Sequence, residues 1–351
     1  MPKTPAAKRA PAPKPRTSLK KKAVARREVR RPPRLPIAQP ARVSVAERRQ
    51  QVMQALEANL AHGFGSALVT TVQVAGLDVK LATVPLPRTF WLLRTHGLAL
   101  KAGVEVALRV PRGKDDTNLP PWVTPVLERL IAHASEKRLS SGQIVRWPKP
   151  FGEGAETELE AFAIGVDPAF GTVTTPHDSV PVLLAVGITG DEERLVREWS
   201  PHALLEVLSR LDPTVATTLD RPSLLASPRA RLAIEHRVEK EGSSMGVLQA
   251  RVSTASMVKN AVSWKLDAEA AGIVVSLLKG RIGHQRPFTV KSDDFELELA
   301  PGDQPAVSVE GNKASLKLNQ VTARNMRATL KPRPGTYAWE TFPNFTLEVV
   351  Q

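Results

Sequence analysis

One twelve-residue stretch, RIGHQRPFTVKS at 281–292, combines basic side chains with a strand-like pattern. Arg281, His284 and Arg286 carry donors that suit a phosphate or a carboxylate. From Phe288 onward, apolar residues alternate with polar ones, as in a half-buried strand. Two interpretations follow. In one, the stretch is a strand, a turn and a second strand whose basic residues are solvated. In the other, the same hairpin directs the three basic side chains into a cleft, where they hold an acidic partner segment.

Catalytic patterns are missing around this stretch and elsewhere. No acid or nucleophile next to His284 could form a catalytic pair with it. The seven histidines show no metal-ligand spacing, and the chain has no phosphate-binding loop, dinucleotide fingerprint or nucleophile elbow. The absence of cysteine excludes disulfides, thiolate zinc sites and a cysteine nucleophile. We therefore predict no catalytic residue, no metal and no cofactor, and keep an enzyme of unrecognised class as a third alternative.

A second candidate site surrounds a tryptophan. Arg146-Trp147-Pro148-Lys149-Pro150 places charge and proline on both sides of an indole ring. Most of the six tryptophans are expected in a core. Here the flanking residues also suit a surface edge or groove, where an aromatic ring anchors a partner. Both interpretations of Trp147 stay open, and Arg146 and Trp147 are both included in the candidate partner-binding site.

The positive charge is concentrated at the N-terminus. The chain carries a net charge of +14, of which residues 1–42 hold +13 through six Lys and eight Arg against one acid, Glu28. Phosphate contacts by such a segment would be independent of sequence, since no aromatic residues are interleaved to stack on bases. The candidate nucleic-acid-binding residues of this tail are Lys20, Lys21, Lys22, Arg26, Arg27, Arg30 and Arg31.

The same segment is predicted to be disordered, because it has too few large apolar residues to offset the entropy of ordering. It lacks the apolar core of a secretory signal, and no stretch of the chain has the roughly 20 apolar residues of a membrane helix. These patterns predict a soluble cytoplasmic protein without a membrane partner.

Helices are expected at three places before residue 225. Ser44 and Glu47 fit a capping box, and apolar residues at helical spacing follow up to Gly63, a residue typical of helix ends. A second helix is expected to begin at Pro120-Pro121-Trp122. A third is expected at Ser200-Pro201, where serine precedes proline at the first helical position.

Strands are expected throughout and dominate the C-terminal part. Apolar and β-branched runs predict strands between 67 and 110, and the continuous apolar run 181–188 predicts a strand buried on both faces. After one more helix near 232–240, alternation predicts further strands, and Glu310-Gly311-Asn312-Lys313 suits a hairpin turn. The alternating residues are Val262, Trp264 and Leu266; Phe295, Leu297 and Leu299; Phe345, Leu347 and Val349.

This distribution predicts an α+β (mixed α/β) fold of two domains. The predicted parts are a disordered tail at 1–42, a mixed domain at 43–226 and a strand-rich domain at 227–351. Each domain is expected to hold a mixed or antiparallel sheet with flanking helices.

Several blocks, in this order and spacing, resemble the Suppressor of Fused family in its short, bacterial-type form, over about residues 90–351. The blocks are Pro120-Pro121-Trp122 to Leu130, Ser141-Gly142 with Trp147 after it, Val186 to Glu193, Leu204 to Leu208, Asp220-Arg221, Arg237 to Val247, and Leu278 to Ser292.

The resemblance implies a non-catalytic protein-binding module with two domains that clamp an extended partner segment as an added strand. For bacterial relatives it implies an immunity protein that neutralises a toxin domain. His133 and Gln143 stand where animal members have a tyrosine and an aspartate that contact the peptide. The resemblance therefore adds both to the candidate partner-binding residues, but we do not expect the animal peptide to be the ligand. The alternative function is sequence-independent nucleic-acid binding by the tail. Neither alternative involves a small-molecule substrate.

Overall fold

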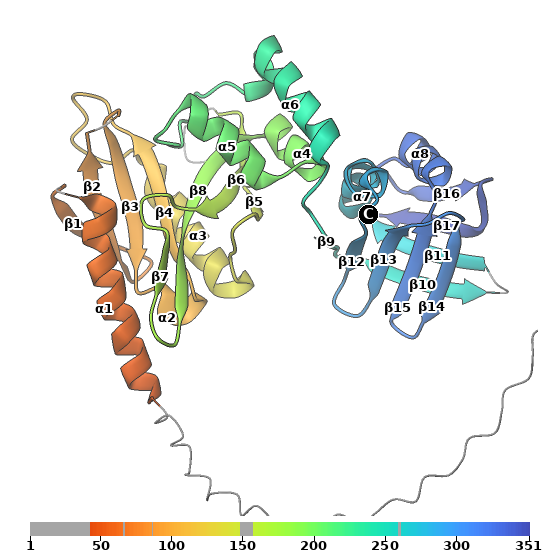
Figure 1. Ribbon diagram of the computed structural model, residues 1–351, viewed down its shortest axis with the longest axis horizontal. Coiled ribbons are helices and arrows are strands. Elements are labelled where there is room, and N and C mark those ends of the chain that lie inside the picture. The colour runs from red at the N-terminus through yellow and green to blue at the C-terminus, as the bar shows by residue number, and fades with distance from the viewer. Residues whose placement is uncertain (1–42, 66, 86, 148–156, 259–260) are drawn as a thin grey trace, which may run out of the picture. The chain divides into compact units, whose positions relative to one another are not determined.

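The computed structural model describes residues 43–65, 67–85, 87–147, 157–258 and 261–351 (Figure 1). The basic segment that precedes residue 43 lies outside these ranges, and with it every residue predicted to bind nucleic acid. Within the described ranges, no helix combines the length and apolar character needed to cross a membrane.

The first helix, α1 (Val45–Phe64), begins at the predicted capping box. Glu47 N donates to Ser44 Oγ over 3.1 Å, and Ser44 N donates to the Glu47 carboxylate over 2.7 Å. The prediction of Gly63 as the helix end is wrong by two positions, because the cap is Gly65. Gly63 instead lies inside the helix against the ring of Phe170, where a Cβ atom would come within 1.9 Å of the ring.

Eight strands form the first sheet, in the order β1-β2-β3-β4-β8-β6-β5 with β7 paired to β8. The strands are β1 (Val69–Val74), β2 (Leu77–Val84), β3 (Phe90–His96), β4 (Glu105–Pro111), β5 (Ile144–Arg146), β6 (Leu159–Val166), β7 (Thr172–Thr174) and β8 (Ser179–Thr189). Only β4 and β8 pair in parallel, so this sheet is mixed.

Helices cover both faces of this sheet. Besides α1, they are α2 (Ala99–Ala102), α3 (Val123–Lys137), α4 (Gly190–Glu198), α5 (Pro201–Leu211) and α6 (Pro228–Glu241), with a 3₁₀ turn η1 (Leu224–Ala226) before α6. The central strand β8 shows the two faces by alternation. Val182 and Leu184 pack in one apolar cluster with α1, α4, α5 and α6, whereas Leu183 packs in another with α3. The prediction of a strand buried on both faces is confirmed.

A buried ion pair joins α4 to the chain segment around residue 221. Arg221 donates from Nη1 and Nη2 to the two oxygens of Glu192, over 2.7 and 2.6 Å. Glu192 is fully buried near the start of α4, and it also accepts from the backbone N–H groups of Thr189 and Leu224. These bonds fix the chain after residue 219 against α4, as a bidentate arginine–carboxylate pair does when its remaining acceptors are satisfied.

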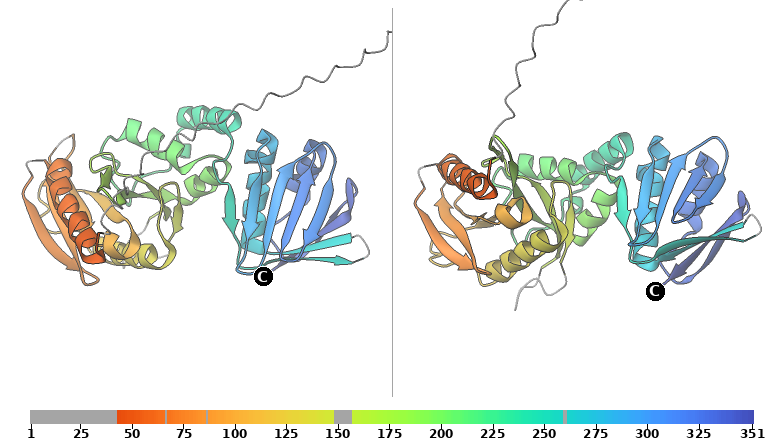
Figure 2. Two further views of the ribbon diagram at one scale, coloured as in Figure 1. Left: turned by 60° about the horizontal axis from the view of Figure 1, so that its bottom comes forward. Right: turned by 90° about the horizontal axis from the view of Figure 1, so that it is seen from below.

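The remaining strands form two further mixed sheets, ordered β10-β11-β17-β16 and β14-β15-β13-β12-β9. The strands are β9 (Val247–Gln249), β10 (Ser253–Val258), β11 (Ala261–Asp267), β12 (Phe288–Lys291), β13 (Glu296–Pro301), β14 (Ala306–Glu310), β15 (Lys313–Leu318), β16 (Gly335–Trp339) and β17 (Phe342–Val350). Helices α7 (Ala268–Gly280) and α8 (Gln320–Thr329) contact each other and the sheets (Figure 2). The predicted hairpin turn is confirmed, because Glu310 pairs with Lys313 across β14 and β15.

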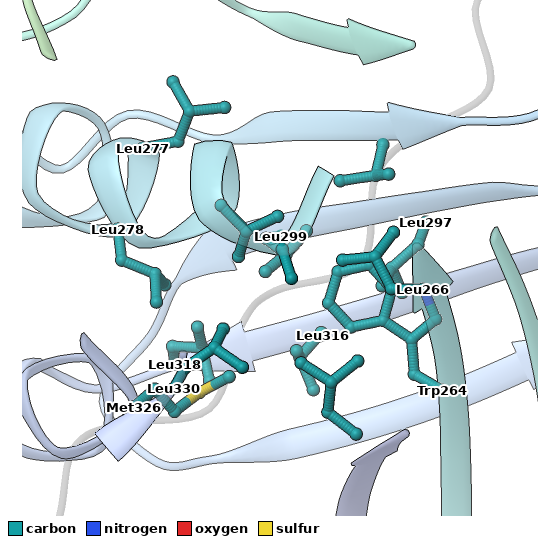
Figure 3. Close-up of a cluster of buried hydrophobic side chains, with 14 of the residues drawn as sticks. Trp264, Leu266, Leu277, Leu278, Leu297, Leu299, Leu316, Leu318, Met326 and Leu330 are labelled. Atoms are coloured by element: carbon teal, nitrogen blue, oxygen red, sulfur yellow. The ribbon is translucent and has the colours of Figure 1, made fainter. Parts of the chain in front are cut away.

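One apolar cluster fills the space between these sheets and helices (Figure 3). Trp264 and Leu266 come from β11, Leu297 comes from β13, and Leu277 comes from α7, all almost completely buried. The buried residues of this cluster all lie between 248 and 349. The helix α6 belongs elsewhere, since Ile234 and Val238 pack in the cluster of the first sheet.

The mixed α+β fold class is confirmed, with three mixed sheets and flanking helices. The domain boundary between 226 and 227 stays a prediction. The hairpin predicted for the stretch 281–292 is wrong in its first arm. Helix α7 continues to Gly280, a 3₁₀ turn η2 (Ile282–His284) follows, and only β12 is a strand. Ile282 is buried in this turn.

Candidate partner-binding site

The strand β5 is an edge of the first sheet, because it pairs with β6 and with no other described strand. Gln143 O accepts from Ile164 N over 3.0 Å, and Trp147 N donates to Glu160 O over 2.7 Å. In an antiparallel pair the bonded positions alternate, so 143, 145 and 147 face β6. The backbone N–H and C=O groups of Ile144 and Arg146 therefore point away from the sheet.

A tight turn places this edge. Gly142 adopts φ +88°, and Gly142 N donates to Ile164 O over 2.8 Å. The carboxamide oxygen of Gln143 accepts from Ser140 N over 3.0 Å, so this side chain closes the turn. Gln143, predicted to contact a partner, thus has a structural contact as well. A partner could reach its remaining NH₂ group.

The ring of Trp147 supports β5 from the core. It is 8% exposed, packs edge-on against Phe162 with centroids 5.4 Å apart, and has the guanidinium of Arg129 4.8 Å from its centroid. The ring is therefore mostly covered by Phe162 and Arg129, and the residue also lines a groove of about 330 Å³ with Arg146, Glu160 and Glu193. Its role as an anchor for a partner stays a prediction. His133 lies one helical turn beyond Arg129 on α3 and is half-buried. Burial, and next the charge of Lys137, lowers the pKa of His133.

Arg146 connects β5 to two helices. Its Nε donates to Glu193 of α4 over 3.1 Å, and its Nη1 donates to Glu269 of α7 over 2.5 Å. Half of the Arg146 side chain stays exposed, so the predicted partner-binding residue is both anchored and accessible. It lines a groove of about 780 Å³ together with residues of α4, α6 and α7.

Glu193 is the centre of this charged network. Its side chain is 8% exposed and accepts from Arg146 and from Arg197, whose Nη2 lies 2.5 Å from Oε1. Burial raises the pKa of Glu193, and the positive charge of Arg146 works against that rise. The network thus holds the Glu193 carboxylate of α4 next to Arg146, the last residue of β5.

The strand β9 is an edge of the five-stranded sheet and pairs in parallel with β12. Thr289 N donates to Gly246 O, and Ala250 N donates to Lys291 O. Positions 246, 248 and 250 therefore face β12, while the backbone groups of Val247 and Gln249 point outward. Both side chains are exposed, and Val247 is 55% exposed.

Two of the predicted basic residues hold the chain that enters β9. Arg281 donates from Nε and Nη2 to Pro287 O over 3.0 and 2.6 Å, and from Nη1 to Ser243 O over 3.1 Å. Arg286 Nη1 donates to Glu241 O over 3.0 Å at the end of α6. These bonds are structural, and the contact of either side chain with a partner stays a prediction.

His284 lies in a different small groove of about 320 Å³. Its neighbours there include Gln320, Arg324 and Arg327 on α8. The structure therefore places the predicted partner-binding residues at three separate locations. Those at β5 and the neighbouring α3 are His133, Gln143, Arg146 and Trp147. Arg281 and Arg286 support the chain that enters β9, and His284 lies in the groove beside α8.

Sequence analysis missed Glu193 and Glu269. The spacing of Glu193 and Arg197, four residues apart on a helix, was the available signal for the first.

Within the described residues, no group of three or more histidine, cysteine, aspartate or glutamate side chains could hold a metal ion. Among the edge strands of the three sheets, β5 and β9 are the ones that the predicted partner-binding residues form or support, and an ion-pair network lies behind β5. Backbone pairing with an extended chain is the interaction that such edges support.

The residues that form β5, α4 and their supports match a known family model. Residues 93–222 match the model described as Suppressor of fused protein (SUFU). This part of the chain is therefore similar to a Suppressor of fused domain. The resemblance predicted from the sequence is confirmed, and the matched range includes both the Arg146–Glu193 pair and the Glu192–Arg221 pair. No curated protein matches the chain.

Three solved structures that match the chain carry the same family name. The crystal structure of Drosophila Suppressor of Fused is 17% identical, with a TM-score of 0.64, over 86% of this chain and 96% of that chain. The structure titled as the Sufu–Fu complex is 18% identical, with a TM-score of 0.44, over 52% and 96%. A SUFU homologue from Neisseria gonorrhoeae FA 1090 is 15% identical, with a TM-score of 0.38, over 49% and 95%. The Drosophila likeness supports the shared fold across the matched region.

Proposed function

We propose that this chain is a non-catalytic protein-binding module of the Suppressor of fused family that takes up an extended segment of a partner as an added strand. The observation that carries the proposal is the outward orientation of backbone groups at Ile144, Arg146, Val247 and Gln249. Added strands gain affinity from main-chain hydrogen bonds and specificity from alternate side chains. The exposed half of the Arg146 side chain lies at this edge and is available to contact the side chains of an added strand.

In its finer form, the proposal is that the two sheet edges clamp one segment and that the partner is a toxin domain, which the protein neutralises as a cytoplasmic bacterial immunity protein. The bacterial-type family resemblance supports this form. A toxin gene beside the gene for this chain would support it further. A neighbouring DNA-repair or chromatin operon would instead favour nucleic-acid binding by residues 1–42.

Proline substitution tests the proposal at a single backbone donor. Val247→Pro removes an N–H group that points away from β12, so it should leave the sheet intact. Loss of one hydrogen bond, about 0.5–1.5 kcal/mol, should weaken partner binding roughly 2- to 13-fold. Val247→Ala keeps the N–H group and is the matched control. Ile144→Pro and Ile144→Ala form the same pair at β5.

The partner is first captured on the full chain and identified by mass spectrometry, and its affinity is then measured by calorimetry for all four variants. Equal affinities for the proline and alanine variants at both edges would contradict strand addition. Failure to capture any specific protein would contradict the binding function itself.

The charge of residues 1–42 favours one alternative, a nucleic-acid-associated protein. Its net +13 stands against +1 for the rest of the chain. Removal of this segment should abolish binding to duplex DNA and leave partner binding unchanged. Binding by the full chain should fall steeply with salt, since each phosphate contact contributes about 0.9 to the logarithmic slope. DNA affinity that survives truncation would contradict this assignment.

A further inference from the structure

A groove between α5 and α6 has no part in the strand-edge proposal. Both helices lie side by side on one face of the first sheet (Figure 1). The groove has a volume of about 480 Å³, within the range of protein ligand pockets. Its apolar lining includes Val207, Leu211 and Ile234, and its charged lining is Arg210, Arg229 and Arg237.

The apolar floor is accessible. Leu211, in the last turn of α5, is 64% exposed. Ile234 is buried at the base of the groove, and the alanines Ala230 and Ala233 keep the α6 wall low. The lining on α6 begins at the cap residue and reaches Arg237, which corresponds to about 15 Å at 1.5 Å per residue. That length accommodates two to three turns of another helix.

The rim is uniformly basic. Of the described residues that line the groove, none carries a carboxylate. Arg210 and Arg237 share the nearby Glu206, and Arg237 also pairs with Glu241, 2.8 Å away. No ion pair is present at Arg229 in the described part of the chain. An occupant with negative charge is therefore favoured, and the chain's own basic N-terminal segment is disfavoured.

The two helices that wall the groove indicate which backbone conformation the bound segment has. Both walls are helices, whose backbone groups bond within each helix, so the groove has no sheet edge to pair with a strand. An extended peptide lying on this apolar floor would leave its own backbone groups without partners, which is costly. A helix satisfies its backbone internally and presents only side chains. We propose that the α5–α6 groove binds an acidic amphipathic helix of a partner protein.

A phage-displayed library of helical peptides, with charged and apolar positions randomised, tests the groove on the full chain. Selection should enrich Asp and Glu together with apolar residues spaced three or four apart. Leu211→Ser and Arg229→Glu should each weaken the selected peptides roughly tenfold or more, as expected when an anchor or a rim charge is lost. Leu232→Ser is the matched control, because Leu232 is 68% exposed on α6 yet does not line the groove. Enrichment of basic or neutral peptides, or equal losses at Leu211 and Leu232, would overturn the proposal.

The chain has no cysteine, so a single cysteine can report on the natural occupant. Ala233→Cys, carrying a photoreactive benzophenone, should cross-link in lysate to an acidic helical segment of another protein, and Arg229→Glu should suppress that product. Cross-links to residues 1–42 of the same chain, or between two copies, would overturn the assignment of the occupant. Val247→Pro should leave groove binding unchanged, so failure at β9 and failure in the groove remain distinguishable.

Discussion

The Nε atom of Arg146 lies 3.1 Å from Oε1 of Glu193, and Arg197 donates to the same carboxylate. The edge strand β5 is thus tied to α4 through one buried acid. Because Arg197 is only 11% exposed, its charge depends on Glu193 for compensation. Glu193 therefore holds the edge strand in place through Arg146 and also compensates the charge of Arg197 within α4.

Glu193→Gln should lower the free energy of unfolding by about 3–5 kcal/mol, because it leaves the charge of Arg197 buried without an anionic partner. Glu269→Gln is the control, since that carboxylate is 49% exposed and pairs with Arg146 at the surface. Its effect should stay within about 1 kcal/mol. Urea unfolding of both variants measures the difference. Equal losses of unfolding free energy in the two variants would show that the contribution of these carboxylates does not depend on their burial.

Arg281→Ala should destabilise the protein by about 1.5–3 kcal/mol, because it removes charged donors from two backbone carbonyls. Arg281→Lys should recover only part of this loss, since an ammonium cannot reproduce the planar fork of the guanidinium. Arg286→Ala removes one bond of an exposed side chain and should cost less. Thermal unfolding measures the series. An unchanged melting temperature for Arg281→Ala would restore a pure binding role for this residue.

Sequence patterns predicted the elements that local contacts determine. The capping box at Ser44 and the apolar run of β8 depend on neighbouring residues and on alternation, and both are confirmed. The hairpin at 281–292 failed because the last turn of α7 and the buried Ile282 resemble an apolar strand over so short a window. No local pattern distinguishes the two.

The edge status of β5 and β9 could not be predicted from the sequence. An edge strand is defined by the absence of a second neighbour, which is a property of the whole sheet. The same holds for Arg146, whose partner Glu193 is 47 residues away, and for the ring of Trp147, which Arg129 covers from α3. Proline and charge around Trp147 suggested exposure, but packing against Phe162 decided its burial.

His96 should make stability depend on pH near neutrality. Burial lowers its pKa below the ordinary value of 6.5, and the charge of Glu57 only partly offsets this effect. The unfolded chain then binds more protons than the folded one, so stability is full above pH 6.5 and is lost as the pH falls through the lowered pKa. His96→Gln should flatten urea-unfolding stability across this window. Glu57→Gln should widen the window, because the opposing charge is gone. A slope unchanged in His96→Gln would assign the dependence to another group.

Gly142→Ala should destabilise the turn before β5 by about 1–3 kcal/mol, because φ +88° is unfavourable for any residue with a Cβ atom. The new Cβ would also lie 2.9 Å from Nε2 of His202. That ring is exposed and can move, so the backbone should account for most of the loss. The double variant Gly142→Ala with His202→Ala separates the two causes in urea unfolding. It should recover little stability, and partner affinity should fall in both variants because the turn places the outward groups of Ile144. Full recovery in the double variant would instead assign the loss to contact with His202.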